Sequence, residues 1–380
     1  MQEPLKYFHV NWIDGMKINK NHFIAMENAF SDQVKDAIGY RITKNNFGLL
    51  PPLYGNNSSV KIVLNVDNQN SIRLKVFECR AITPSGARIE LFENSPDIYN
   101  FNYTYPETAY ELDATKEVIL YVALSVDPFI RIPVGNADPS EEPPRYPYTL
   151  PEIKVHIIPE NQLTKKELGP NFLTIGRIIK VDGKPEIDKE YIPPCTSVQA
   201  HNQLARLHAE FDRFLGQLEL DVIKILKKIH EKEQSNLLAL VVAQLTEYLM
   251  FFLSTNILDF RLKVADQTPL AMFETIARCA RLIKNSIDSN STKAKEELLN
   301  YFAEWCSLSQ GEIDEMLINT VNFQYEHTRI HETVVIMTKF AEVISTLFSK
   351  LSNLEYIGKK KETLFVKEEQ KVKKSFLVDD

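Results

Sequence analysis

Two histidines come closest to a recognisable chemical pattern in this sequence. His327 and His331 stand four residues apart in the run EHTRIHE, so on a helix they would share one face and could bind one metal ion. The run lacks the internal glutamate of a zinc protease, and no third ligand follows at a suitable spacing. We therefore expect His327 to be a packed residue that fixes helix register, and we expect no metal.

Cysteine chemistry is the next possibility. The four cysteines are far apart and form no C-x-x-C pair, which is typical of reduced thiols inside a cell rather than of a disulfide framework. Cys195 follows Pro193-Pro194, but no neighbouring charge that would lower its pKa is evident. A buried thiol is the expected state of Cys195, not a nucleophile.

Motifs for other reactions are missing from the chain. It has no G-x-G-x-x-G, G-x-x-x-x-G-K-[ST], G-x-S-x-G or H-E-x-x-H run, and Asp67–Asn70 lacks the glycine and closing glutamate of a calcium loop. The formal net charge of −7 gives no overall basic footprint for nucleic acid. The sequence thus predicts a protein that is not an enzyme, holds no cofactor and binds no nucleic acid.

Proline divides the chain into two halves of different structure. All but one of the 19 prolines precede Cys195, so the first half cannot be a helical bundle. Short β-rich runs separated by turn residues favour a β-sandwich or an open barrel. The predicted strands are 60–66, 72–76, 87–92, 117–126, 153–158 and 172–181.

A proline-rich segment interrupts these strands. Residues 132–152 carry six prolines and are predicted to be an exposed loop, either a plain linker or a docking arm. Aromatic residues dominate interface energies, so Tyr146 and Tyr148 would anchor such an arm.

The second half predicts helices over 204–229, 235–262, 268–288 and 292–306, with Pro269 at the first position of one of them. Residues 237–253 are apolar but carry Gln244 and Glu247, so we expect a buried helix rather than a membrane span. From the capping signal at Ser309, one very long helix is predicted to run to about Leu354. Its apolar seam is the expected trimer contact: Phe323, His327, Ile330, Val334, Met337, Ile344, Phe348 and Leu351.

The stretch NWIDGMKINKNHF, residues 11–23, predicts a strand, a tight turn at Asp14-Gly15 and a short helix. Trp12, Gly15-Met16 and then His22-Phe23 also resemble the N-terminal signature of TssK-type baseplate subunits of bacterial type VI secretion systems. Further similarities follow in order at Ile38-Gly39-Tyr40, at Arg145-Tyr146 and at Ile192-Pro193-Pro194-Cys195. Asp14 departs from the glutamate of that signature, and Lys20-Asn21 from its Pro-Gln.

The resemblance implies a structural adaptor. Such subunits have a β-sandwich shoulder like that of siphophage receptor-binding proteins, followed by a helical bundle. They form homotrimers that join the baseplate wedge to the membrane complex. By this resemblance the chain would be cytoplasmic, docked at the inner face of the inner membrane through the secretion assembly. Trp12, Tyr146 and Tyr148 would face the wedge. A phage-tail receptor-binding or baseplate protein is the alternative.

These patterns together predict three parts. Residues 1–192 would be the β-sandwich shoulder, 193–357 the helical and trimerising domain, and 358–380 a tail with seven lysines and five acidic residues. Related proteins usually carry a globular head after the bundle, and here the tail takes its place in the chain. The tail is therefore the expected contact with the membrane complex, in the manner of a short, divergent Bacteroidetes-like form.

Overall fold

The computed structural model describes residues 4–53, 58–66, 72–92, 103–105, 119–163, 169–181 and 184–358. The chain forms two compact units, and each draws on several stretches of the sequence. Unit 1 comprises Met1–His208, Val264–Met272 and Tyr325–Glu332, and unit 2 comprises Ala209–Lys263, Phe273–Gln324 and Thr333–Asp380.

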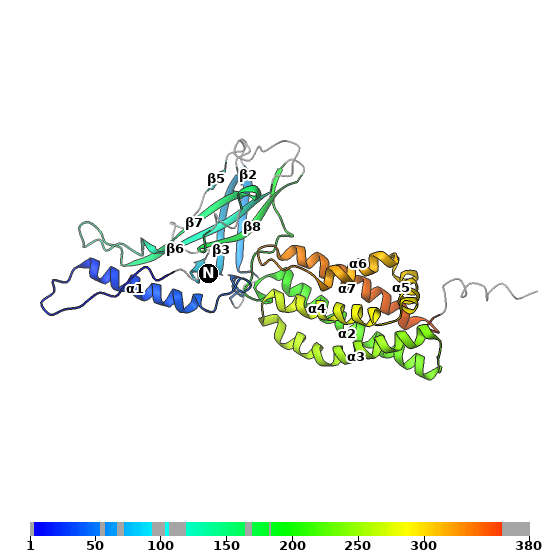
Figure 1. Ribbon diagram of the computed structural model, residues 1–380. Helices are drawn as coiled ribbons and strands as arrows, with labels where there is room; N and C mark the ends of the chain where they lie inside the picture. Colours follow the sequence, from blue (N-terminus) through cyan, green and yellow to red (C-terminus); the bar gives the residue numbers. More distant parts are fainter. Residues whose placement is uncertain are drawn as a thin grey trace, which may run out of the picture. The chain divides into compact units, whose positions relative to one another are not determined.

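Unit 1 contains two antiparallel sheets (Figure 1). In the first, β3 pairs with all four other strands, and in the second the strand order is β7-β6-β8-β9. The strands are β1 (Gly48–Leu49), β2 (Val60–Val66), β3 (Ile72–Ile82), β4 (Arg88–Leu91), β5 (Tyr103–Tyr105), β6 (Leu120–Val134), β7 (Tyr148–Pro159), β8 (Phe172–Val181) and β9 (Lys184–Ile187).

Hydrophobic alternation explains why these strands form where they do. On β3, Ile72, Leu74 and Val76 are buried at every second position, as expected for a strand with one face on a core. On β6, residues 120–124 are buried without interruption, because β6 lies between β7 and β8 and is covered on both faces. The prediction of an N-terminal β region is confirmed, whereas its packing as a sandwich stays a prediction.

The segment 132–152 is not a loop throughout, contrary to expectation. Its two ends belong to the long hairpin of β6 and β7, with Ile132 opposite Leu150 and Val134 opposite Tyr148. Pro133 is tolerated there because β8 pairs with β6 only as far as Ser125, which leaves one edge of β6 without a ladder to break. Only the hairpin tip, residues 135–147, is irregular.

Seven α-helices are described. They are α1 (Lys20–Gly39), α2 (Asn202–Glu231), α3 (Leu237–Lys263), α4 (Pro269–Asp288), α5 (Thr292–Cys306), α6 (Gln310–Val321) and α7 (Ile330–Asn353). The four helices predicted between residues 204 and 306 are confirmed, and α4 begins at Pro269 as expected. Helix α1 reaches well beyond the short segment predicted for it, and residues 4–19, the described part of the chain before it, form no strand.

The single long helix predicted from Ser309 to Leu354 is wrong. The capping box at Ser309 forms, but the helix ends at Val321 and a new one begins at Ile330. Neither glycine nor proline causes this break. His327 leaves helical geometry because its Nε2 hydrogen-bonds the carbonyl of Phe47 at 2.8 Å and its Nδ1 pairs with the Tyr325 hydroxyl at 2.7 Å. Partners far away in the sequence therefore override local helix propensity.

The expected trimer seam changes with this break. Phe323 and His327 are not in a helix, and Val334 is only half-buried. A side chain with no exposed surface in one chain offers none to a second copy, so the core of the predicted seam cannot join copies through these residues. The members with 0–2% exposure are Ile330, Met337, Ile344, Phe348 and Leu351.

Two sequence predictions concern regions where the structure says less. The Lys-rich tail, apart from Gly358, lies outside the described residues, as does the Asp67–Asn70 turn. Among the described residues, one helix, Leu237–Asp266, is long and apolar enough to cross a membrane, and half of its apolar window is buried within the protein.

Candidate functional site: an exposed apolar surface around α1

Helix α1 begins within residues 11–23, the stretch whose spacing resembles the N-terminal signature described above. Asp14-Gly15 forms the predicted turn, in which the Met16 amide donates to the Ile13 carbonyl at 3.2 Å. Gly15 has a φ of +77°, a conformation that glycine adopts without strain. Asn19 then caps α1, and the His22 side chain accepts a hydrogen bond from the Asn19 amide at 3.2 Å. His22 therefore acts here as the return partner of a capping box.

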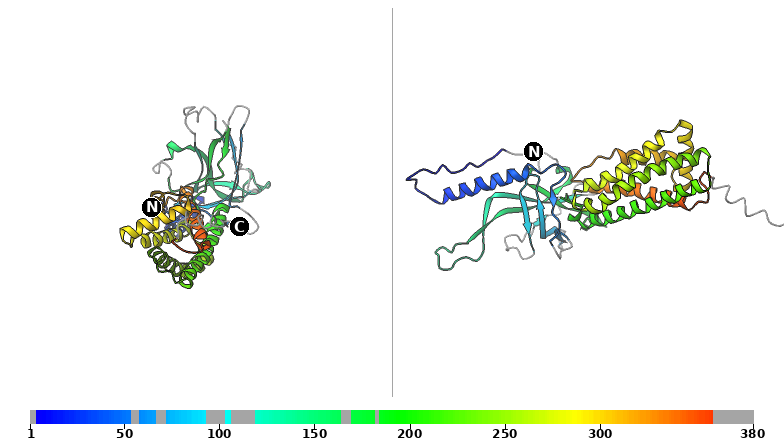
Figure 2. Two further views of the ribbon diagram at one scale, coloured as in Figure 1. Left: turned by 90° about the vertical axis from the view of Figure 1, so that its right-hand side faces the viewer. Right: turned by 90° about the horizontal axis from the view of Figure 1, so that it is seen from below.

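The chain before the turn lies back along α1 and is held there. The buried carboxylate of Asp32 accepts hydrogen bonds from the amides of Lys6 and Tyr7, at 2.5 and 3.1 Å. His9 pairs with the Gln33 side chain at 2.8 Å. Residues 4–18 and α1 thus form one antiparallel arm, which is blue in Figures 1 and 2.

The arm is anchored on β6 at an irregularity of that strand. Pairing with β7 shifts register between Asp127 and Arg131, and Arg131 reaches Glu27 and also the Asn28 side-chain oxygen, the latter at 2.8 Å. Phe129 stacks against Tyr7 with ring centroids 4.5 Å apart. The bulge aims these side chains at α1 rather than into the sheet, a common use of bulges.

The outward face of the arm is apolar. Phe23, Phe30, Val34 and Ile38 follow spacings of seven, four and four, which places them on one side of α1, and each is 42–59% exposed. Apolar patches above a few hundred Å² are rare on monomers and mark contact sites. We call this face the arm surface; it consists of Phe8, Trp12, Ile13, Ile18, Phe23, Phe30, Val34 and Ile38.

The three residues predicted to face a wedge are all exposed. Trp12 belongs to the arm surface and lies edge-on to His22 with centroids 6.0 Å apart, while Tyr146 and Tyr148 lie at the β6–β7 hairpin tip and are 52% and 70% exposed. The arm and the hairpin extend in the same direction in Figures 1 and 2. Among the described residues, Trp12 makes no hydrogen bond or ring contact with either tyrosine.

The sequence prediction missed the helical part of the arm surface. Phe23, Phe30, Val34 and Ile38 carry a readable signal, because their spacing repeats that of an amphipathic helix. A pattern of spacing cannot tell a core-facing stripe from an exposed one, however. The decisive fact is the exposure of these four side chains, each 42–59% in the structure, which shows that the apolar side of α1 faces outward.

Arg177 and the two histidines of EHTRIHE are engaged in structural pairs. Arg177 donates to Asp188 at 2.6 Å and to His331 Nε2 at 3.1 Å. Desolvation, and then the Arg177 charge, lower the pKa of His331. Burial lowers the pKa of His327 to about 4, so its ring is neutral at pH 7. Both histidines of EHTRIHE therefore act as hydrogen-bond partners.

Cys195 is fully buried, as predicted, and its thiol donates to the Pro193 carbonyl at 3.1 Å. Burial raises the pKa of this thiol, the opposite of what a nucleophile needs. Among the described residues, no three histidine, cysteine or acidic side chains gather closely enough to hold a metal ion.

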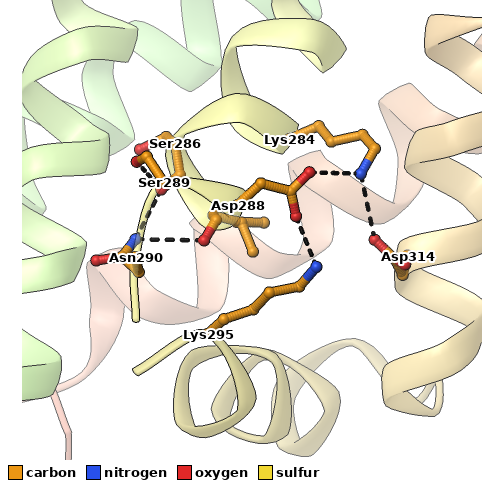
Figure 3. A network of polar contacts seen from close by, with 8 residues as sticks. Lys284, Ser286, Asp288, Ser289, Asn290, Lys295 and Asp314 are labelled. Carbon is orange, nitrogen blue, oxygen red and sulfur yellow. Dashed lines mark hydrogen bonds and ion pairs between the residues drawn. The ribbon is translucent and has the colours of Figure 1, made fainter. Parts of the chain in front are cut away.

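A charged network in unit 2 also has a structural role (Figure 3). The Asp288 carboxylate forms ion pairs with the side-chain amines of Lys284 and Lys295, both at 2.6 Å. The Lys284 amine also lies 3.7 Å from the Asp314 carboxylate. Burial raises the pKa of Asp288, but the two lysine hydrogen bonds outweigh it and hold the pKa below its ordinary value. The network joins the end of α4 to α5 and α6, and every charge in it is paired.

A hollow of about 260 Å³ lies beside α1, lined by Asp32, Asp36, Tyr40 and Ser85 among others. It falls below the usual ~300–1,000 Å³ of small-molecule sites. Around α1, the exposed apolar surface rather than this hollow is the feature that suits binding, and such surfaces suit a protein partner.

No protein-family model and no curated protein sequence matches the chain. Solved structures do match, each at probability 1.00. Solved structures of TssK are among them. A crystal structure of TssK has 14% identity and a TM-score of 0.46, with 88% of this chain and 67% of that one covered.

Two further structures give similar values. TssK from the EAEC type VI secretion system, in complex with a nanobody, has 12% identity and a TM-score of 0.48, covering 86% of this chain and 98% of the other. A TssK-TssF-TssG baseplate subcomplex has 14% identity and a TM-score of 0.46, covering 89% and 100%. At these values the function has to be argued from the residues of this chain.

Proposed function

We propose that this chain is a structural subunit of a type VI secretion baseplate, a divergent TssK-like adaptor without enzymatic activity. The observation that carries this is the arm surface, which exposes apolar side chains from Phe8 to Ile38 on an arm anchored to β6 through Arg131. A surface of this kind suits protein docking. The titratable groups described above are engaged in ion pairs and hydrogen bonds within the chain, which suits a structural role.

The residues that give the chain its resemblance to TssK-type subunits support this function because each has a defined position. Gly15 and His22 shape the arm, as described above. In the core of unit 1, the Pro194 carbonyl accepts a hydrogen bond from the Leu49 amide at 2.7 Å. Cys195 and Leu49 form an isolated parallel β-bridge through their backbones. Both parts of the signature thus organise unit 1, one at an exposed surface and one in the core.

The adaptor would act as a homotrimer on the cytoplasmic side of the inner membrane. Its arm surface and the β6–β7 hairpin tip would bind the wedge subunits, with Trp12, Tyr146 and Tyr148 as anchors. Rigid aromatic side chains bring large contact area at a small cost in conformational entropy. The Lys-rich tail would contact the membrane complex, and the proposed parts are those predicted from the sequence: 1–192, 193–357 and 358–380.

Affinity purification of the tagged chain from its own cells tests this function. We expect wedge and sheath proteins to co-purify, and the double variant Tyr146→Ala, Tyr148→Ala to lose most of the wedge protein while folding normally. Val335→Ala is the matched control, since Val335 is a 67% exposed apolar residue of α7. Co-purification of tail-fibre proteins instead would favour the phage-tail function, and undiminished wedge binding by the double variant would move the interface elsewhere.

A further inference from the structure

Helix α3 has an apolar face that the rest of unit 2 leaves exposed. Its inward residues, among them Leu245, Leu249 and Phe252, are buried. The outward side is also rich in large apolar side chains, each 48–74% exposed. We call this face the α3 stripe: Leu237, Leu240, Tyr248, Phe251, Leu258 and Leu262. Helix α3 lies at the outside of the helical group in Figures 1 and 2.

The stripe follows the spacing of a helix–helix seam. From residue 244 to residue 262, exposed positions recur at 244, 248, 251, 255, 258 and 262, which are alternating steps of four and three. This spacing keeps one line of side chains facing a partner helix in left-handed packing. A core stripe would show the same pattern, but here the positions have no covering element in the described chain.

We propose that the α3 stripe is the surface through which copies of this chain associate, and that three α3 helices pack in parallel around a common axis. The proposal rests on the trimer of the proposed function and supplies the contact face that α7 cannot provide. A seam of this kind is self-complementary, because each helix presents the same knobs and holes.

Size supports a second copy as the occupant. At roughly 180 Å² for a fully exposed large side chain, the α3 stripe exposes about 630 Å² per chain, a large part of the ~800 Å² that each partner buries in a stable interface. Leu220 and Ile223 of α2, which are 54% and 44% exposed, add to the apolar surface of the same unit. Arg261 of α3 pairs with Asp212 of α2, so these two helices are neighbours.

Charge also favours self-association. The seam positions from Leu237 to Leu262 carry no charge, except that Glu247 lies at their edge. The charges near the C-terminal end are already neutralised within the chain, since Lys263 pairs with Asp259 at 2.7 Å and Arg261 with Asp212 at 3.1 Å. Identical copies can therefore approach along the α3 stripe without strong repulsion.

A lipid surface fits the stripe less well. Helices that lie on membranes carry lysine and arginine along their polar edge, whereas the α3 stripe is bordered by Glu247 and by ion-paired charges. Crossing a membrane would strip the inward side of α3, including the fully buried Leu249 and Leu253, from its own core.

Light scattering coupled to size exclusion tests the proposal with the full chain. We expect a mass of about three chains for the wild type and of one chain for the double variant Phe251→Glu, Leu258→Glu, with unchanged circular dichroism. Val335→Glu, which places the same charge on an equally exposed apolar position of α7, should keep the trimeric mass. A wild-type monomer, or a double variant of wild-type mass, overturns the proposal.

Cysteine cross-linking gives an answer even if the charged variant fails to fold. Thr255→Cys in a Cys306→Ser background should yield a disulfide-linked pair on mild oxidation, because parallel helices bring equivalent seam positions together. Glu296→Cys on α5 should not. Failure of Thr255→Cys to cross-link, or vesicle binding by the wild type that the double variant loses, contradicts the parallel seam.

The two proposals can fail separately. If wedge proteins co-purify with the wild type and the double variant stays trimeric, the α3 stripe is not the contact face and the adaptor function stands. If the double variant becomes monomeric but no wedge protein is captured by the wild type, the contact face stands and the adaptor function fails.

Discussion

At the residue scale, His327 shows how one buried side chain can decide an element. It links Tyr325 and the Phe47 carbonyl, and its ring also meets the Phe47 ring with centroids 4.9 Å apart. Both ring nitrogens are used by neutral partners, and burial lowers its pKa to about 4. His201 is likewise buried, with its pKa lowered by desolvation to about 4.

Because of these two histidines, we expect the folded protein to lose stability in acid. In the unfolded chain a histidine binds a proton below about pH 6.5, whereas in the folded chain each stays neutral down to about pH 4. The free energy of unfolding should therefore fall as the pH falls from 6.5 towards 4. Between pH 7 and pH 5 the loss should be about 2 kcal/mol for each histidine.

Urea unfolding at pH 7 and pH 5 measures this loss. His327→Gln keeps a donor for the Phe47 carbonyl but cannot take up a proton, so its pH dependence should be smaller by about 2 kcal/mol. The exposed His230, changed to Gln, is the control and should retain the wild-type dependence. Equal pH dependence in the wild type and in His327→Gln would contradict this prediction, because it would mean that the His327 ring takes up protons alike in the folded and the unfolded state.

Gly48 gives a second prediction at this scale. Its φ is +115°, and a Cβ atom there would lie 2.0 Å from the Pro194 carbonyl oxygen. Gly48→Ala should thus cost more than about 3 kcal/mol, because backbone strain and a backbone clash add together. Gly216→Ala in α2, where a Cβ meets nothing within 4 Å, should instead stabilise by about 0.5–1 kcal/mol. Thermal unfolding of the two variants makes the comparison, and a stable Gly48→Ala would refute the close approach.

At the element scale, the arm is held to unit 1 by few contacts. We expect Asp32→Ala to release residues 4–9, because it removes the acceptor of the Lys6 and Tyr7 amides, at a cost of about 1–3 kcal/mol. Hydrogen exchange at these two amides should rise well above the wild-type rate. Asp36→Ala, one turn further along α1 and exposed, should leave the exchange unchanged, and equal rates in all three proteins would show that Asp32 does not hold the arm.

Most elements could be predicted from the sequence, and the exceptions have physical causes. The strands at 60–66 and 172–181 and the start of α4 at Pro269 match their predicted limits, because alternation and capping are local signals. The break between α6 and α7 could not be predicted, since the cause is a hydrogen bond between residues 280 positions apart. The paired ends of the β6–β7 hairpin, which include Pro133 and Pro151, could not be predicted because a proline-rich composition suggests a loop.

The candidate site was only partly predictable for a related reason. Trp12, Tyr146 and Tyr148 stand out as aromatic residues in turn-rich surroundings, and all three are exposed. The α1 part of the arm surface and the α3 stripe carry ordinary helical periodicity, which reports one apolar face but not what covers it. The predicted seam of α7 shows the reverse case, because most of its apolar side chains are buried against other residues of the same chain.

At the scale of the whole molecule, unit 1 is assembled from segments that the ribosome makes far apart in time. The Phe47 carbonyl waits for His327, and Tyr325–Glu332 completes a unit that begins at the N-terminus. At about 5–20 residues per second, some 14–56 s separate the synthesis of these two partners. Unit 1 is thus begun early but completed late, and we expect the surface that residues 325–332 later cover to stay exposed on the nascent chain during that interval.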